Sequence, residues 1–220
     1  MNEKHIACDV DEVIVNISPK WILLSSQILP HNTKLKNCIM EKEKEGIYEK
    51  FILERSHGYI QTMLEKEFDV TKEEISKIDE LYYSNETFYD DLKPTKFAES
   101  LIKASNLGKL NSITFITKNR KKDDPSNASK IRFLNHYFKN VKIKIFEVFD
   151  KEPKSAVLNK NGPFDIFVDD SLDNIAEVLA NGKKGKVKEI LIPSLGYNKD
   201  IPEIIFLAAK LNGINIGFID

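Results

Sequence analysis

The chain has 220 residues, of which 41% are hydrophobic and 30% are charged, as in ordinary globular proteins. A compact chain of this length buries roughly 70% of its unfolded surface, so one large domain, or a core with a smaller appended domain, is feasible. The 33 basic and 34 acidic residues leave a net charge of −1, which argues against a polyanion such as nucleic acid as the main partner.

The two cysteines, Cys8 and Cys38, do not suggest a disulfide framework, which fits a reducing compartment. No run of 18 apolar residues occurs, and the first residues, MNEKH, do not form a cationic apolar leader. We therefore expect a cytoplasmic protein without a membrane partner. We expect it to be a monomer or a homodimer.

The first predicted element is an apolar strand over residues 4–10, which runs into the string IACDVDEVIV. Asp9 and Asp11 lie where this strand ends. A parallel sheet binds its ligands in the crevice beyond the carboxyl ends of its strands. Two carboxylates placed there can supply a nucleophile and an acid/base, or they can hold a divalent cation.

A long helical segment is expected next. Ser18 as N-cap and Pro19 in the first turn predict the start of a helix. Residues 32–89 contain no strong strand pattern, and Thr71 and Glu74 fit a capping box. Because this segment precedes the second strand, we predict a small helical cap inserted into an α/β core. The predicted boundaries are 18–89 for the cap, and 1–17 together with 90–220 for the core.

Beyond the cap, predicted strands and helices alternate. Pro94 is expected to begin a helix that ends at Gly108, and further helices are expected over Ile131 to Leu134, over 154–158, from Ser171 and from Pro202. Strands are expected at 112–116, 141–148, 165–168, 189–192 and 214–218. This alternation predicts a Rossmann-like parallel sheet with helices on both faces.

Chemically useful residues recur at the ends of the later strands. Thr117 closes the string ITFIT and is followed by an expected polar loop over 118–126, and Asp169 and Asp170 close DIFVDD. Lys151 and Lys154 lie between the third and fourth strands. Four carboxylates in one crevice repel each other, so a cation is expected among them, and ligands that are all oxygen favour Mg²⁺ over Zn²⁺. A lysine and a threonine beside that cation suggest a substrate with phosphate oxygens.

Each candidate residue also has a purely structural interpretation. A pair of aspartates at a strand end is often only solvated, and a threonine there often caps a loop. Lysines at helix starts or in polar loops usually point to solvent, which applies to Lys118 as a further candidate for phosphate contact. A functional site is favoured because four such positions follow one another in order along the chain.

This ordered set resembles the haloacid dehalogenase (HAD) superfamily, whose members are mostly Mg²⁺-dependent phosphatases. Asp9-Val10-Asp11 resembles the first motif, in which the first aspartate is the nucleophile and the second is the acid/base. Thr117 resembles the second motif, and Lys154 in KSAVL resembles the third. Asp169-Asp170 in FVDDSLDNI resembles the fourth.

The resemblance implies residue roles and a fold. It implies that Mg²⁺ is bound by Asp9, the backbone carbonyl of Asp11 and Asp170, with Asp169 close by, and that Thr117 and Lys154 contact the phosphate, with Lys118 of the polar loop as a further candidate. It also implies that Asp9, Asp11, Thr117 and Lys154 are catalytic. The helical insertion matches the C1-type cap of the superfamily, and the motif spacing is most similar to the 5′(3′)-deoxyribonucleotidase-type branch.

Two departures from the family pattern stand out. Position 12 is Glu where the family usually has Gly. The gap from Lys154 to Asp169 is longer than in the branch named above, so Lys151 is an alternative for the motif lysine.

The leading hypothesis is a Mg²⁺-dependent phosphomonoesterase that acts on a small phosphorylated metabolite through an aspartyl-phosphate. A (deoxy)nucleoside monophosphate is the first substrate to consider, because aromatic residues of the cap such as Trp21, Tyr59, Tyr82 and Tyr83 can stack on a base, although such residues more often form a core. The alternatives are a sugar phosphate, phosphoserine or a polynucleotide end as substrate, or a phosphate-binding module without catalysis.

Overall fold

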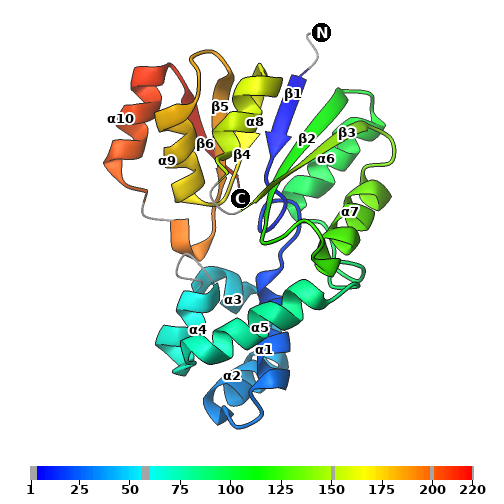
Figure 1. Ribbon diagram of the computed structural model, residues 1–220, viewed down its shortest axis with the longest axis vertical. Coiled ribbons are helices and arrows are strands. Elements are labelled where there is room, and N and C mark those ends of the chain that lie inside the picture. The colour runs from blue at the N-terminus through cyan, green and yellow to red at the C-terminus, as the bar shows by residue number, and fades with distance from the viewer. Residues whose placement is uncertain (1–3, 56–59, 150–151, 199–200, 220) are drawn as a thin grey trace.

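A computed structural model describes residues 4–55, 60–149, 152–198 and 201–219 (Figure 1). A six-stranded sheet forms its centre, in the order β3-β2-β1-β4-β5-β6. The strands are β1 (Lys4–Cys8), β2 (Leu110–Asn119), β3 (Lys142–Phe149), β4 (Phe164–Val168), β5 (Val187–Pro193) and β6 (Asn215–Ile219). Every neighbouring pair is parallel.

The strand order reverses its direction between β1 and β4, because β2 and β3 lie on one side of β1 whereas β4, β5 and β6 lie on the other. Open parallel sheets bind ligands at such a switch point, beyond the carboxyl ends of the strands. The topology therefore places the ends of β1, β2 and β4 side by side where a site is expected.

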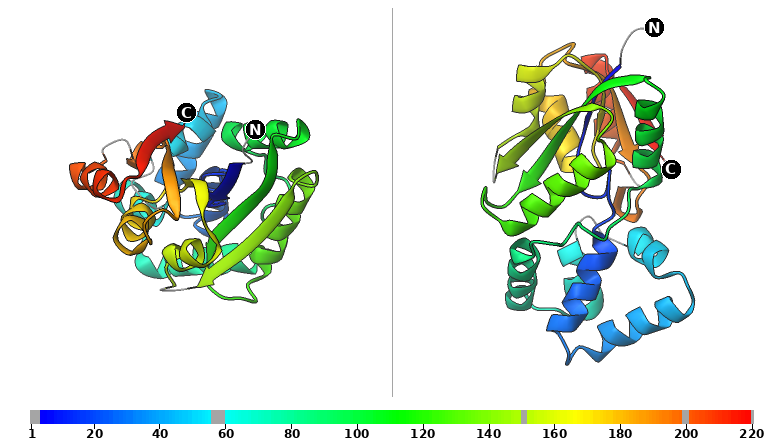
Figure 2. Two further views of the ribbon diagram at one scale, coloured as in Figure 1. Left: turned by 90° about the horizontal axis from the view of Figure 1, so that it is seen from above. Right: turned by 90° about the vertical axis from the view of Figure 1, so that its right-hand side faces the viewer.

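Helices cover both faces of the sheet (Figure 2, left). One face is covered by α6 (Lys96–Asn106) and α7 (Pro125–Tyr137), and the other by α8 (Lys154–Asn161), α9 (Leu172–Asn181) and α10 (Glu203–Asn212). Along β1, Ile6 and Cys8 pack into the first cluster and Ala7 into the second, as alternation in a strand buried on both faces requires. The predicted fold class, a Rossmann-like parallel sheet between two layers of helices, is confirmed.

Five further helices lie together beyond the carboxyl ends of the strands (Figure 1). They are α1 (Ser18–Ile28), α2 (Thr33–Lys44), α3 (Tyr48–Arg55), α4 (Ile60–Phe68) and α5 (Lys72–Ser84), and we call them the helical group. The capping box predicted at Thr71 and Glu74 is present at the start of α5. The apolar cluster that holds the group together continues into the sheet, where it includes Ile113 and Phe115. The predicted limits of a cap over 18–89 and a core over 1–17 and 90–220 stay predictions.

The helical group touches the sheet domain closely at Gly196, in the short 3-10 turn (Gly196–Asn198) after β5. A Cβ atom at this position would overlap the carbonyl oxygen of Glu54 in α3. Only glycine fits this approach. None of the helices in the described ranges combines the length and the apolar character that crossing a bilayer requires.

Several predicted boundaries differ from the structure, and three of them do so for a clear local reason. Ser18 is the first residue of α1 and not its N-cap, because the side chain of Glu12 accepts hydrogen bonds from the Ile17 and Ser18 amides at 3.1 and 2.7 Å. Pro94 precedes α6, which begins at Lys96 after Thr95 as N-cap.

The third wrong boundary concerns the end of β2. The sequence predicts a polar loop from Lys118, but β2 stays paired with β3 through Asn119. Thr117 and Lys118 therefore lie in the strand, with side chains on opposite faces. This difference explains their different burial in the site.

Candidate active site

The deepest part of the site joins the ends of β1 and β4 to the start of α8. The amide of Asp9 donates to the carbonyl of Val168 at 2.8 Å, which holds the two strand ends together. Lys154, the first residue of α8, places its Nζ atom 2.6 Å from Asp9 Oδ2 and 2.8 Å from Asp169 Oδ2. The Lys154 side chain is 0% exposed, so one ammonium group binds two carboxylates away from water.

Burial sets the charge states in this pocket. It raises the pKa of Asp9 to about 6, against the opposing pull of Lys154. Burial alone would lower the pKa of Lys154, but the carboxylates of Asp169 and Asp9 outweigh it and raise the pKa above its ordinary value. At neutral pH the lysine is therefore charged and Asp9 is an ionised carboxylate, as a nucleophile must be.

Three carboxylates meet at this point in a way that suits a hard cation. Oxygen atoms of Asp9, Asp169 and Asp170 lie within 4.8 Å of one another. Asp169 is fully buried, and its Oδ1 accepts hydrogen bonds from the Ser171 amide and the Asn174 side chain, each at 3.0 Å. Carboxylate oxygens this close together are the ligands that a hard divalent cation prefers, so these residues fit Mg²⁺.

Asp11 points to a different set of partners. Its Oδ1 accepts a hydrogen bond from the Tyr89 hydroxyl at 2.7 Å, and its Oδ2 lies 2.8 Å from Lys130 Nζ. Lys130, on α7, also donates to the Thr117 hydroxyl at 3.0 Å and to Asn119 Oδ1 at 3.2 Å. The carboxylate of Asp11 is thus not part of the group formed by Asp9, Asp169 and Asp170.

The two candidates on β2 differ in position. Thr117 is 1% exposed, and its hydroxyl oxygen accepts a hydrogen bond from Lys130. Lys118 is exposed and lines the cavity over the catalytic candidates. Lys118 can therefore approach an anion from solvent. The buried Thr117 instead supports the floor of the site.

This cavity lies between the sheet and the helical group and has a volume of about 230 Å³. Its sheet side includes Asp9, Asp11, Lys118 and Asp170, and its helical side includes Trp21, Ile60, Gln61, Asp79, Tyr82 and Tyr83. The three aromatic residues of this wall are among those the sequence predicts to line a cleft. Tyr59 and Lys151 lie outside the described residues.

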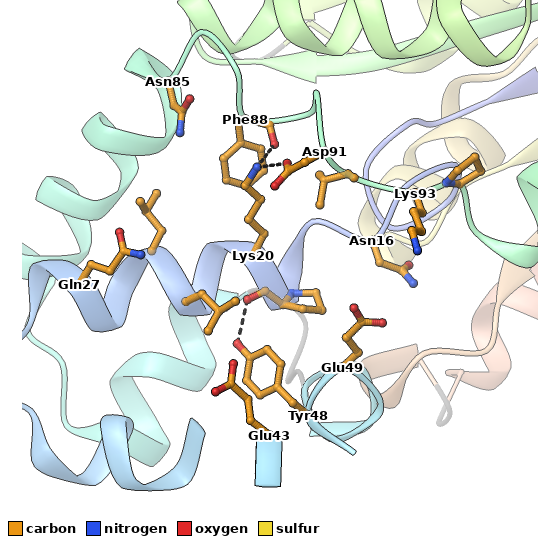
Figure 3. Close-up of a pocket in the computed structure, with 15 residues that line it drawn as sticks. Asn16, Lys20, Gln27, Glu43, Tyr48, Glu49, Asn85, Phe88, Asp91 and Lys93 are labelled. Atoms are coloured by element: carbon orange, nitrogen blue, oxygen red, sulfur yellow. Dashed lines mark hydrogen bonds and ion pairs between the residues drawn. The ribbon is translucent and has the colours of Figure 1, made fainter. Parts of the chain in front are cut away.

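A larger cavity of about 720 Å³ lies against a different face of α1 (Figure 3). It contains none of the predicted site residues. Its one central cation, Lys20, is bonded to the Phe88 carbonyl at 2.7 Å and to Asp91, and Tyr48 donates to the Pro19 carbonyl at 2.8 Å. Lys20 and Tyr48 therefore serve the packing of α1, whereas predicted site residues line the smaller cavity, so chemistry and not size identifies the smaller cavity as the candidate site.

Glu12 has a structural role that the resemblance to the HAD superfamily does not imply. Its φ angle of 59° lies in the left-handed region, which explains why glycine is usual at this position. Here the side chain caps α1, and its Oε1 also accepts a hydrogen bond from the Ser18 hydroxyl at 2.6 Å. Burial raises the pKa of Glu12 to about 7, although the hydrogen bonds from Ser18 oppose this shift.

Sequence reasoning misses Lys130 and Tyr89, and it identifies Glu12 only as a departure from the family pattern, without its capping role. Only Lys130 has a usable signal, because it falls one turn before Phe133 and Leu134, on the buried face of α7. A lysine on the apolar face of a helix is seldom solvated, which indicates a buried and paired charge.

No protein-family model matches this sequence, and no curated protein is similar to it in sequence. Several solved structures are similar in fold. A candidate phosphatase from Clostridium difficile is 12% identical with a TM-score of 0.54, over 100% of this chain and 95% of that one. A predicted phosphoglycolate phosphatase from Haemophilus somnus is 14% identical with a TM-score of 0.52, over 99% and 94% of the two chains.

A HAD-superfamily hydrolase of subfamily IA from Geobacter sulfurreducens is 16% identical with a TM-score of 0.50, over 94% of this chain and 96% of that chain. At such low identities the likeness concerns the fold alone. It extends over nearly the whole chain, so both the sheet domain and the helical group are included. The chain therefore has the fold of the HAD-type hydrolases.

Proposed function

We propose that this protein is a Mg²⁺-dependent phosphomonoesterase that hydrolyses a small phosphorylated metabolite. The observation that carries the proposal is the buried ammonium group of Lys154, which lies 2.6 Å from Asp9 at the edge of a cavity between the sheet and the helical group. An ionised carboxylate beside a fixed cation is suited to attack an anionic phosphate. The fold shared with HAD-type hydrolases supports the same activity.

In the proposed reaction, Asp9 attacks phosphorus and the bond from phosphorus to the leaving oxygen breaks. Asp11 gives its proton to that oxygen and then takes a proton from the water that hydrolyses the aspartyl-phosphate, which restores Asp9. Lys154, Lys118 and the Thr117 hydroxyl are the proposed phosphate contacts.

Asp9, Asp169 and Asp170, together with the backbone carbonyl of Asp11, are the proposed Mg²⁺ ligands. Bound Mg²⁺ would neutralise charge between the nucleophile and the phosphate. The helical group is proposed to act as the cap that excludes water and bulky substrates. This arrangement favours small monophosphates over phosphoproteins.

Nucleoside monophosphates are the first candidate substrates, because the partly buried Tyr83 lines the cavity and has an apolar ring. Trp21 and Tyr82 also line it but are buried in the apolar core. Sugar phosphates, phosphoserine and polynucleotide ends are the alternatives within the same chemistry. Steep loss of affinity with salt would identify the polynucleotide. Location in the cytoplasm and a monomeric or homodimeric state stay predictions.

The decisive experiment is hydrolysis of a generic aryl phosphate, with and without Mg²⁺, by the native chain and by Asp9→Asn. We expect Mg²⁺-dependent release of phosphate that falls by at least about 10³-fold in the variant, because Asn cannot form the acyl phosphate. Asp165→Asn, a change elsewhere in the chain at an exposed ion pair with Lys188, is the matched control. Equal rates for native chain and Asp9→Asn would contradict the proposal, and binding of phosphate without turnover would favour the non-catalytic module.

A further inference from the structure

The helical wall of the cavity carries a carboxylate that the proposed hydrolysis does not use. Asp79, on α5, lines the same cavity as Asp9 and is half-buried. Its hydrogen-bond donor among the described residues is Gln61 on α4, with Nε2 3.3 Å from Asp79 Oδ1. One long hydrogen bond leaves most of the acceptor capacity of a carboxylate unused.

The guanidinium of Arg120 opposes the effect of burial on the pKa of Asp79 but does not form an ion pair with it. Arg120 lies beside the wall, where its Cζ atom is 4.4 Å from the centre of the Tyr83 ring. Its donors go elsewhere, with NH1 2.6 Å from Glu80 Oε2 and NH2 3.0 Å from Asp124 Oδ1. Within the described ranges, Asp79 therefore faces the cavity without an ion-pair partner, and burial raises its pKa above the ordinary value.

The reaction geometry determines what reaches this wall. Asp9 attacks from the sheet side, and in-line displacement places the leaving oxygen on the side of phosphorus opposite the nucleophile. The organic part of the substrate then extends toward the helical group, where Asp79 and Gln61 lie. The cavity of about 230 Å³ is smaller than most sites for drug-sized ligands, so a short leaving group reaches them.

Resting on the proposed phosphatase function, we propose that Asp79 selects monophosphate esters whose leaving group carries a hydroxyl or amino donor. The donor fills the vacant acceptor positions of the carboxylate, with Gln61 as a second polar contact. A leaving group that carries a second anion is rejected, because it would meet Asp79 in a cavity already lined by Asp9, Asp11 and Asp170. Small polyol and amino-alcohol phosphates are the class that fits, in preference to the larger nucleoside monophosphates.

The test compares three esters with matched phosphate groups: glycerol 3-phosphate, which has hydroxyl donors, n-propyl phosphate, which has none, and phosphoglycolate, which has a carboxylate. Values of kcat/KM are measured with excess Mg²⁺ at constant ionic strength. We expect the native chain to prefer glycerol 3-phosphate over propyl phosphate by about 10- to 100-fold, as a hydrogen bond to a charged acceptor allows. Phosphoglycolate should be the poorest of the three.

Two variants separate hydrogen bonding from charge. In Asp79→Ala the ratio of glycerol 3-phosphate to propyl phosphate should fall toward one. Asp79→Asn keeps an acceptor but not the charge, so it should retain part of that ratio while gaining on phosphoglycolate. Glu73→Ala, at an exposed position of the same helix, is the control and should leave both ratios unchanged.

The outcomes distinguish the two proposals. Hydrolysis that requires Asp9 but shows the same ratios in the native chain and in both Asp79 variants overturns the role of Asp79 and leaves the phosphatase function intact. A native preference for phosphoglycolate overturns it as well. Absence of Asp9-dependent hydrolysis with all three esters overturns the proposed function and this inference together.

Discussion

Each of the two aspartates of the Asp-Val-Asp string has its own buried lysine, and the two pairs are built differently. Lys154 binds Asp9 and Asp169 at the ends of β1 and β4, inside the sheet domain. Lys130 binds Asp11 from α7, and the same carboxylate accepts a hydrogen bond from Tyr89, in the segment that leads from the helical group back to the sheet.

This comparison divides the site into two halves. The fixed half, Asp9 with Lys154, is held by the sheet domain, and the second half, Asp11 with Lys130, also contacts the segment that follows the helical group. Asp9 is positioned by strands that belong to one sheet. Asp11 is positioned by Tyr89, whose hydroxyl lies 2.7 Å from that of Tyr82 on α5. Among the described residues, the bonds that position the proposed nucleophile come from the sheet domain, whereas the orientation of the proposed acid/base also depends on the helical group.

The largest expected effect comes from breaking the fixed half with Lys154→Met. The variant leaves the carboxylates of Asp9 and Asp169 buried without a counter-charge, which typically costs about 3–5 kcal/mol. We expect this loss in the free energy of unfolding, measured by urea denaturation without Mg²⁺. Addition of Mg²⁺ should restore part of it if the cation binds the same carboxylates.

Lys188→Met is the control for that experiment. Lys188 forms an ion pair with Asp165 but is 68% exposed, and exposed pairs contribute little. A loss for Lys154→Met no larger than for Lys188→Met would mean that Asp9 and Asp169 do not need the counter-charge of Lys154.

The second test breaks the other half with Lys130→Met. We expect kcat to fall about 100-fold with a smaller change in KM, because Asp11 loses the cation that orients it. Lys139→Met, an exposed site just after α7, should change neither quantity. An unchanged kcat for Lys130→Met would limit Lys130 to packing.

The third test uses Glu12, which joins the aspartate string to α1. Its pKa is raised by burial from 4.5 to about 7, so between these values the folded chain holds a proton that the unfolded chain has released. Stability should therefore fall as pH rises through this window, by on the order of 2 kcal/mol. Glu12→Gln should remove that part of the fall in thermal melts from pH 4.5 to 7, whereas the exposed control Glu73→Gln should not. If the melting temperatures of the native chain and of Glu12→Gln changed equally with pH, Glu12 would not hold the proposed proton in the folded chain.

The smallest effect is expected for Tyr89→Phe, which removes one hydrogen bond to Asp11 and keeps the ring. A hydrogen bond to a charged group is worth about 1.5–3 kcal/mol, so we expect kcat to fall about tenfold or somewhat more. Tyr137→Phe is the matched control, since this half-buried tyrosine packs on Phe133 away from Asp11. A full loss of activity would show that the helical group controls Asp11 more strongly than Lys130 does.

The sheet and the strand ends could be predicted because their signal is local. An apolar run that stops at Asp9 or Asp169 reveals both the strand and the polar group at its end, and parallel strands bring those ends together. Lys154 could be placed because it lies at a helix start between two such strands.

The Asp11 half could not be predicted, because its contacts are not local. Tyr89 is 78 residues away from Asp11 in sequence, and Lys130 is 119 residues away. A helical lysine is by default a solvated residue, and only its register with Phe133 and Leu134 argues otherwise. The left-handed backbone at Glu12 gives no sign in a single sequence either, because the residue that favours it, glycine, is replaced.

The close contact at Gly196 offers a position at which a substitution should separate the helical group from the sheet domain. A single added methyl group there would collide with the backbone of α3. Side chains of increasing size should therefore increase the distance between the helical group and the sheet domain in steps. Such a series would provide variants with graded separations of the two parts. The separation could be measured by small-angle scattering or by a pair of attached probes.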